Sequence, residues 1–417
     1  MKKFWCLFLL VMMLGCVSEP SDPVVLASAS PVPVETAAPT QTPAETPKPT
    51  PEPTEIPTPT PTLSPEERLM QYVASLSVEE RIGQLCMFGF SGTETISAEF
   101  RKILQTYCIG NVVLYGKNVV RTDADGGFAQ CRKLTDSVRN ASKSEIPLLI
   151  SIDVEGGSVT RFRWERSLSS ARTLGNRDDP DRAEEQFRYI AEGLLRAGIN
   201  VDLAPCVDVT KHPDGSFLKK RIVSSDEEVA ARIGAACIEG LHEGGCLSIV
   251  KHYPGHGATN TDSHDKTPVV DRSLDSLYSY ELVPFAETAA TADGMMVAHI
   301  LYPEIDPDHV ATLSEIFITE ILRGELGFTG FVVSDDFRMA GLRSQASIPD
   351  CAVQFVLAGG DLILCGANHS YQKQILAGLY EAVENGTISE TRLNESVYRI
   401  LTAKMRATGW DPFETEE

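Results

Sequence analysis

The chain has 417 residues, of which 58 are acidic and 37 basic, and its formal net charge is −21. An acidic surface of this kind repels phosphate backbones, which argues against nucleic acid as a partner. It also repels anionic polymers weakly, so a substrate of that class would have to be held by local contacts.

The first fifteen residues predict an export signal. Lys2 and Lys3 precede an apolar run over residues 4–14 that is too short to span a bilayer. Gly15 before Cys16 is typical of a lipoprotein processing site, where Cys16 would become the lipidated first residue. A signal that is cleaved without lipidation is the alternative. We therefore expect a lipid anchor on the extracellular face of the cell membrane.

Residues 16–62 predict a disordered stalk that begins at the lipidated cysteine. Proline, threonine, glutamate and alanine dominate this stretch, and prolines recur from residue 31 to residue 61. Such a composition cannot bury a core, and repeated X-Pro pairs favour an extended chain of about 3.1 Å per residue. The prediction is a semi-rigid spacer between membrane and domain; a linker whose length has no function is the alternative.

Residues 63–411 alternate short apolar runs with longer amphipathic stretches, and residues 412–417 are expected to be a tail. The expected strands are 84–90, 111–115, 147–152, 200–203, 247–252, 294–300, 331–334 and 361–365. The expected helices are 97–107, 127–143, 181–197, 226–243, 274–291, 313–325, 346–358, 370–385 and 389–407. Eight such alternations predict an α/β protein with a single (β/α)₈ TIM-type barrel as its catalytic domain. A doubly wound open sheet is the competing topology.

Eight cysteines lie within this domain, most of them inside the apolar runs. Exported proteins usually oxidise their cysteines, but a thiol buried in a strand or helix is equally natural. We expect mostly free thiols at positions 86, 108, 131, 206, 237, 246, 351 and 365.

Reactive side chains follow four of the expected strands. Asp153 follows the third strand, a histidine-rich loop the fifth, His299 the sixth and Asp335 the seventh. In a parallel barrel these positions meet at the carboxyl ends of the strands, where barrel enzymes keep their sites. A single carboxylate at such a position is often only a helix cap.

The histidine-rich loop is the most informative stretch. Residues 251–257 read Lys-His-Tyr-Pro-Gly-His-Gly, and Asp262-Ser263-His264 follows. Asp262 can hold one imidazole nitrogen of His264 and leave the other free to exchange a proton with a substrate. Chance clustering of histidines near a surface loop is one alternative. Another is a metal site built from His252, His256, Asp262 and His264.

These two segments closely resemble the signature of family 3 glycoside hydrolases in the bacterial β-N-acetylglucosaminidase branch, here in lipoprotein form. The run Ser334-Asp335-Asp336-Phe337 is similar to the nucleophile segment of that family. The resemblance implies that Asp335 is the nucleophile and that Asp262 and His264 form the acid/base pair. It implies a structural role for Asp336. The sugar contacts that it implies are Asp153, Arg161, Arg221, Lys251, His252 and His299.

The resemblance implies a retaining exo-β-N-acetylglucosaminidase that removes terminal non-reducing β-N-acetylglucosamine, with peptidoglycan fragments as the expected source and chitooligosaccharides as another. We expect no cofactor, no resident metal and a monomer. A family 3 β-glycosidase of other specificity, or a phosphorylase of N-acetylglucosaminides, stays open. So does a non-catalytic sugar-binding lipoprotein, although Asp335 and His264 are both present. A metal-dependent amidohydrolase barrel would need a His-x-His motif after the first strand, and residues 85–90 contain no histidine.

Overall fold

The computed structural model describes residues 63–259 and 266–414. Cys16 and the expected stalk lie outside the described residues. Asp262 and His264, the expected acid/base pair, also lie outside them.

Eight parallel strands form the sheet predicted for a (β/α)₈ barrel. Their order is β10-β1-β2-β3-β4-β5-β6-β9, and a parallel bridge between Val333 and Leu362 joins β9 to β10. The sheet therefore closes on itself, which confirms the barrel and excludes the open doubly wound sheet. The strands are β1 (Cys86–Gly89), β2 (Asn111–Val113), β3 (Leu149–Ile152), β4 (Val201–Asp202), β5 (Leu247–Tyr253), β6 (Gly294–Val297), β9 (Phe331–Ser334) and β10 (Ile363–Cys365).

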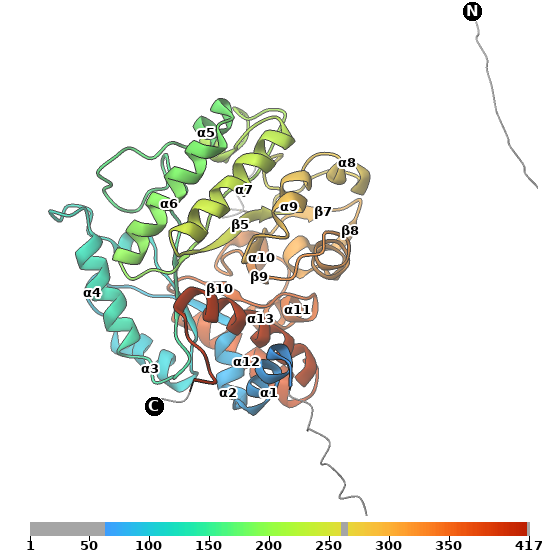
Figure 1. The fold of residues 1–417 in the computed structure, drawn as a ribbon. Helices are drawn as coiled ribbons and strands as arrows, with labels where there is room; N and C mark the ends of the chain where they lie inside the picture. Colours follow the sequence, from blue (N-terminus) through green and yellow to red (C-terminus); the bar gives the residue numbers. More distant parts are fainter. Residues whose placement is uncertain (1–62, 260–265, 415–417) are drawn as a thin grey trace, which may run out of the picture. The chain divides into compact units, whose positions relative to one another are not determined.

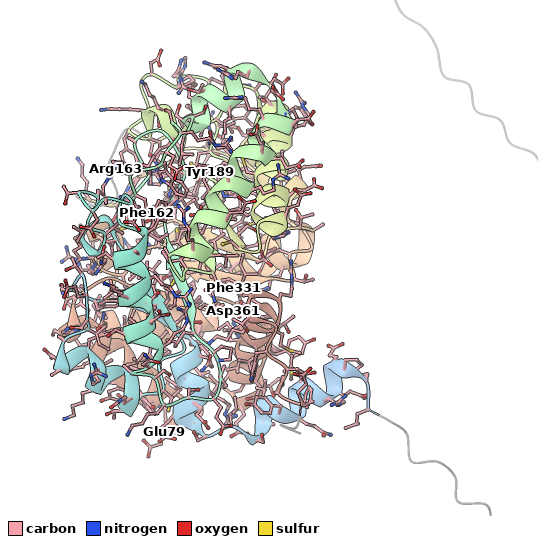
Figure 2. All side chains as sticks on the ribbon, turned by 60° about the vertical axis from the view of Figure 1, so that its left-hand side comes forward. Glu79, Phe162, Arg163, Tyr189, Phe331 and Asp361 are labelled. Atoms are coloured by element: carbon pink, nitrogen blue, oxygen red, sulfur yellow. The ribbon has the colours of Figure 1, made fainter. Side chains whose placement is uncertain are left out.

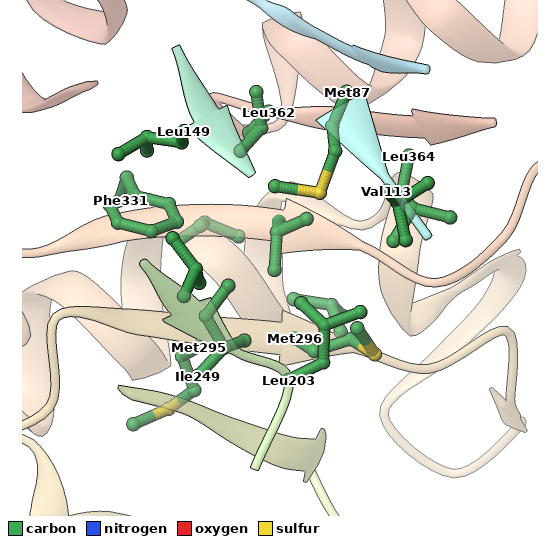
Figure 3. Close-up of a cluster of buried hydrophobic side chains, with 14 of the residues drawn as sticks. Met87, Val113, Leu149, Leu203, Ile249, Met295, Met296, Phe331, Leu362 and Leu364 are labelled. Atoms are coloured by element: carbon green, nitrogen blue, oxygen red, sulfur yellow. The ribbon is translucent and has the colours of Figure 1, made fainter. Parts of the chain in front are cut away.

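Every residue of these eight strands is buried, as expected where helices cover the outside of a barrel and side chains fill its inside. Figure 3 shows large apolar side chains converging in the interior, among them Met87, Leu149, Ile249 and Phe331. The apolar runs in the sequence thus became strands because both of their faces lose contact with water.

Helices surround the sheet in the ribbon of Figure 1, and α6 and α7 lie side by side. The helices are α1 (Pro65–Ser75), α2 (Val78–Gln84), α3 (Ala98–Thr106), α4 (Phe128–Arg139), α5 (Ala171–Arg177), α6 (Pro180–Arg196), α7 (Glu227–Glu243), α8 (Leu274–Tyr278), α9 (Val283–Thr288), α10 (Ala340–Arg343), α11 (Ile348–Leu357), α12 (His369–Glu384) and α13 (Glu390–Thr408). Shorter or non-α helical turns are η1 (Gly116–Asn118), η2 (Lys219–Arg221), η3 (Ala311–Leu313) and η4 (Ile316–Glu325). In the described part of the chain, no helix combines the length and the apolar character needed to cross a membrane.

Several elements differ from the predictions. The expected helix over 274–291 is broken into α8 and α9, because Pro284 in the first turn of α9 has no amide hydrogen to continue the hydrogen bonding of a single helix. The sixth strand ends at Val297 rather than at residue 300, and a short hairpin of β7 (Leu301–Tyr302) and β8 (Asp306–Val310) follows. The expected helix over 313–325 is η4, which has π-type hydrogen bonding.

Two helices before the first strand, α1 and α2, were not predicted. Each begins with a capping box, in which a serine accepts from the amide three residues on and a glutamate bonds back to the amide of the serine. The pairs are Ser64 with Glu67 and Ser77 with Glu80. This spacing is a readable helix-start signal in the sequence.

The last helix, α13, lies against the amino ends of the strands. Asp361, just before β10, is fully buried and accepts hydrogen bonds from Arg392, Arg399 and Ser396 of α13. Arg323 of η4 donates to the other oxygen of the same carboxylate over 2.5 Å. Figure 2 labels Asp361 beside Phe331, the first residue of β9. One carboxylate therefore fastens two barrel strands to the helix that covers them.

Two further groups of α13 reach the same end of the barrel. The amine of Lys404 is buried and donates to Gln84 Oε1 over 2.6 Å and to the Gly110 carbonyl over 2.7 Å, and these residues precede β1 and β2. Arg406 forms a 2.7 Å ion pair with Asp293, which precedes β6. The helix thus contacts the starts of strands that lie far apart in the sequence.

The eight cysteines of the described chain are all free thiols, as predicted. Cys108 is half-buried and the other seven are buried. Their environment is the apolar packing of strands and helices, not a framework of cross-links.

Candidate active site

A cavity of about 310 Å³ opens at the carboxyl ends of the strands. Segments that follow or end β2, β3, β5, β9 and β10 supply its walls, together with the segment around Phe217 and Arg221. The cavity therefore occupies the place predicted for the chemistry. Its charged and imidazole-bearing lining residues are Asp153, Glu155, Arg161, Arg221, Lys251, His252, His256, Asp335, Asp336 and Arg338.

One wall is a chain of alternating charges. Lys251, at the end of β5, donates to Asp153 Oδ1 over 2.7 Å and forms a second 2.7 Å ion pair with Glu155. Arg221 donates two hydrogen bonds, of 2.7 and 2.8 Å, to the same Glu155. Arg161 donates to the other oxygen of Asp153 over 3.1 Å. Four of the predicted sugar contacts thus meet at one surface, through a glutamate that was not among them.

These ion pairs fix the charges of the wall. Burial by itself would raise the pKa of Glu155, but Arg221 and Lys251 outweigh burial and hold it well below its ordinary value. For Asp153, burial is likewise opposed by Lys251 and Arg161, and its pKa is lowered. The wall therefore carries two carboxylates and three cations, a rigid set of hydrogen-bonding groups suited to the hydroxyls of a sugar.

His252 is held in one orientation by Asp208. The Nδ1 atom of His252 lies 2.7 Å from Asp208 Oδ2, and its Nε2 lies 3.1 Å from Nη2 of Arg221. An arginine can only donate, so Nε2 accepts and Nδ1 carries the proton given to Asp208. Although burial opposes it, His252 and His256 lower the pKa of Asp208 to about 2. His252 is thereby linked both to Asp208 and to the charged wall.

The glycines of the motif let its loop turn tightly beneath this wall. Gly255 has a φ of 135°, a backbone conformation that residues with a Cβ rarely adopt. At Gly257 a Cβ would collide with the Val209 carbonyl. His256 follows the turn: its amide donates to Asp208 Oδ1 and its Nδ1 lies 2.6 Å from Thr259 Oγ1. Burial, together with the neighbouring His252, lowers the pKa of His256 to about 4.

Asp335 lines the cavity directly after β9. Its backbone amide donates to the Val297 carbonyl over 3.0 Å, and its Oδ1 accepts the amide of Asp336 over 2.7 Å. Among the described residues, no lysine or arginine forms an ion pair with Asp335. Burial raises its pKa, but His299, His252 and the Asp336 amide together lower it. Asp335 is therefore an ionised carboxylate whose orientation is fixed by its own backbone.

Asp336, the next residue, connects several strand ends through its carboxylate. It accepts from the Tyr115 hydroxyl over 2.8 Å, from the side chain of Arg338 and from the amide of Gly366. These partners belong to segments after β2, β9 and β10, so the carboxylate ties three strand ends together. Its contacts suit the structural role that the family resemblance implies.

His299 is the remaining predicted sugar contact. It is fully buried, with Nδ1 2.8 Å from Thr312 Oγ1 and Nε2 3.3 Å from the Asp336 carbonyl. It is not among the residues that line the cavity. Its position behind the Asp335–Asp336 backbone explains its influence on the pKa of Asp335.

Sequence reasoning missed Asp208, and it did not assign Glu155 to the wall. Both carboxylates follow strands, β4 and β3, which was the available signal. Their partners lie 44 residues away for Asp208 and 66 for the Glu155–Arg221 pair. No local pattern specifies such pairings.

Among the described residues, one group offers metal-binding donor atoms within 4.8 Å of one another, namely Cys206, Asp208 and His252.

The sequence is similar to those of known proteins. The family model described as "Glycosyl hydrolase family 3 N terminal domain" matches residues 77–403. A beta-hexosaminidase of Idiomarina loihiensis is 33% identical over 304 residues, covering 72% of this chain and 88% of that protein. Beta-hexosaminidase A of Pseudoalteromonas piscicida is 33% identical over 339 residues, covering 75% of this chain but only 56% of that protein.

Two solved structures are also similar to this chain. The glycoside hydrolase family 3 β-N-acetylglucosaminidase from Paenibacillus sp. str. FPU-7 superposes with a TM-score of 0.76 at 36% identity, covering 82% of this chain and 65% of that chain. The β-N-acetylhexosaminidase from Beutenbergia cavernae gives a TM-score of 0.72 at 27% identity, covering 79% of this chain and 99% of that chain.

Proposed function

Because this chain belongs to glycosyl hydrolase family 3, we propose that it is a retaining exo-β-N-acetylglucosaminidase that hydrolyses terminal non-reducing β-linked N-acetylglucosamine. The observation that carries the proposal is the ionised Asp335 in the same cavity as the wall of Asp153, Arg161, Arg221, Lys251 and His252. The relatives named β-hexosaminidase and β-N-acetylglucosaminidase support the choice of sugar.

The proposed reaction has two steps. Breaking a glycosidic bond creates positive charge at the anomeric carbon, which a carboxylate below the sugar stabilises and then captures. Asp335 forms this bond to the anomeric carbon while His264 gives a proton to the departing oxygen. In the second step His264 takes a proton from water, and the water oxygen displaces Asp335 with net retention. Asp262 would orient the imidazole and stabilise its protonated form.

The wall would hold the sugar during both steps. The N–H donors come from Lys251, Arg161 and Arg221, and the acceptor oxygens come from Asp153. A sugar hydroxyl can therefore be bound whether it accepts or donates a hydrogen bond. Since each of these groups is already fixed by an ion pair, little ordering remains to be done when the sugar binds. This fits a pocket for one terminal sugar.

The natural substrate and location form a second part of the proposal. Peptidoglycan fragments suit a protein held outside the membrane by lipid at Cys16, with residues 17–62 as spacer. Replacing Cys16 by serine should release the protein from the membrane fraction and leave its activity unchanged. A Cys16→Ser protein that still partitions with membranes would show that the anchor lies elsewhere.

Substrate choice is tested with chromogenic glycosides. The β-N-acetylglucosaminide should be cleaved at least tenfold faster than the β-glucoside, whereas equal rates would contradict the sugar assignment. Product analysis in phosphate buffer separates hydrolysis from phosphorolysis, since only the latter releases sugar 1-phosphate. Activity that survives prolonged chelation would agree with a site that needs no metal.

The acid/base role is tested by leaving-group dependence. His264→Ala should be slow on a sugar leaving group, which departs only with a proton, and fast in the first step on an acidic phenol, which needs none. The mutant should then stall as a glycosyl-enzyme, and azide, which needs no general base, should restore turnover as a β-glycosyl azide. Asp262→Ala should behave in the same way but more weakly. Equal loss on both substrates with no azide effect would move the role to another residue.

A further inference from the structure

His252 in the cavity wall and two side chains next to it offer different metal-binding atoms in one place. They are the Cys206 thiol, the Asp208 carboxylate and the His252 imidazole, and all three residues are buried. Their donor atoms lie within 4.8 Å of one another. Cys206 and Asp208 follow β4, whereas His252 stands at the end of β5, so two neighbouring strands hold the group in register.

One carboxylate oxygen is the centre of the group. Asp208 Oδ2 accepts from the Cys206 thiol over 3.2 Å, from His252 Nδ1 over 2.7 Å and from the His252 amide over 3.2 Å. The first two protons are held by atoms that also bind metals once the proton leaves. A site where such protons converge on a carboxylate is a place where a divalent ion can replace them.

We propose that Cys206, Asp208 and His252 form an inhibitory binding site for a thiophilic divalent cation such as Zn²⁺ or Cd²⁺. One thiolate, one carboxylate and one neutral imidazole together carry two negative charges, which match the charge of the ion. Binding releases the thiol proton to solvent and leaves the imidazole with a single proton. Sulfur and nitrogen ligands favour these ions over Mg²⁺ or Ca²⁺, which prefer oxygen.

The inhibition follows from the other side of the imidazole. When a metal holds Nδ1, the remaining ring proton must sit on Nε2, which faces Nη2 of Arg221 at 3.1 Å. The N–H group at His252 Nε2 and the N–H group of Arg221 would then both be donors pointing at each other, so Arg221 has to move. Arg221 is also the bidentate partner of Glu155, so the disturbance reaches the wall proposed to hold the sugar. The ion is thus an inhibitor, and the metal-free enzyme is the active form.

Cadmium alone, without substrate, provides the direct test. The purified chain titrated with Cd²⁺ should show the ultraviolet charge-transfer absorption of a cadmium–thiolate bond, and Cys206→Val should lose it. Cys206→Ser should lose it as well, while retaining a hydroxyl that can donate to Asp208. The matched control is Cys237→Val, because Cys237 is a buried thiol that lines the same small internal void but is not part of the group. That variant should keep the absorption.

Zinc inhibition provides the functional half. Zn²⁺ should reduce the activity of the native chain and of Cys237→Val, chelation should restore it, and Cys206→Val or Cys206→Ser should need at least roughly tenfold more zinc. Persistence of both the cadmium absorption and the zinc sensitivity in the Cys206 variants would overturn the proposal. Loss of both in His264→Ala with retention in Cys206→Val would overturn it in favour of a site that uses His264 instead of Cys206. Since the cadmium signal needs no substrate, the result is independent of whether the proposed glycosidase activity is correct.

Discussion

The two ends of the barrel contain similar charges in different settings. At the carboxyl end, Glu155 is buried between Arg221 and Lys251, and its partners line a cavity open to the substrate. At the amino end, Asp361 is buried among Arg323, Arg392 and Arg399, and two of these arginines come from α13, which lies over the strands. Both carboxylates have lowered pKa values, because cations outweigh the effect of burial.

The two clusters have similar charges, but they differ in whether other elements bury them completely or leave one side open to a cavity. This difference decides whether a cluster stabilises the fold or can bind a ligand. A buried carboxylate whose partners are all taken up by other elements can only fasten those elements together. When one side of a similar cluster faces a cavity, its remaining hydrogen-bonding capacity is left for a ligand. A strongly perturbed pKa is therefore a guide to function only together with an open face. Four variants test this contrast.

The largest effect should be on catalysis, at the open end. Asp335→Ala removes the proposed nucleophile and should lower kcat/KM at least about 10⁴-fold, a barrier increase of about 5.5 kcal/mol. The free energy of unfolding should not fall, because the described residues supply no lysine or arginine partner for this carboxylate. Steady-state kinetics and chemical denaturation measure the two quantities. A variant that loses stability but keeps its activity would reverse the assignment.

The next effect should be on stability, at the closed end. Asp361→Ala leaves three partly buried arginines without their buried carboxylate and should cost about 3–5 kcal/mol of unfolding free energy. Activity per folded molecule should stay within about twofold of the native value. Ser396→Ala is the matched control, since it removes one hydrogen bond to the same carboxylate and should cost about 1 kcal/mol. An equal loss of activity per folded molecule would show that the closed cluster also serves the site.

Glu155→Gln should show the reverse balance of effects. It keeps the shape of the side chain but removes the charge shared by Arg221 and Lys251, and we expect kcat/KM to fall about 10²-fold, or about 2.7 kcal/mol. Its cost in stability should be smaller than that of Asp361→Ala, because water in the cavity can solvate the two cations. The exposed Glu165→Gln, on the segment after β3, is the control and should change neither quantity. A larger stability loss than for Asp361→Ala would remove the distinction between the two ends.

The smallest effect concerns pH. Burial lowers the pKa of Lys404 well below the ordinary value of lysine. The unfolded chain therefore binds a proton there that the folded chain does not, up to about pH 10.4, so this group makes stability rise with pH. Relative to Lys404→Met, the native chain should gain up to about 1.4 kcal/mol of unfolding free energy per pH unit between pH 8 and 10. Denaturation at several pH values measures this slope, and a difference between the two proteins that does not change with pH would contradict the prediction.

The barrel was predictable because its strands are buried on both faces and stand out as apolar runs. All eight were located, and β9 was predicted with its observed bounds. The ends of the helices are governed by weaker, local signals, which is why Pro284 broke one predicted helix and the capping boxes of α1 and α2 were passed over.

The site was predictable to the extent that it follows strand ends. Asp153, Lys251 and Asp335 line the cavity as expected, because the carboxyl ends of parallel strands meet. The partners that fix them are set by three-dimensional packing. Nothing near His252 in the sequence indicates Asp208, and nothing near His299 indicates its contact with the Asp336 carbonyl.

The position of α13 has a consequence for biosynthesis. The acidic groups that precede β6 and β10 leave the ribosome before the helix that supplies Arg406, Arg392 and Arg399. At 5–20 residues per second, Asp293 waits roughly 6 to 20 s for Arg406, which lies about 110 residues later. During that time the nascent barrel lacks its amino-end cover, and its unneutralised carboxylates oppose collapse. The amino-end cover of the barrel can therefore form only after α13 has been synthesised.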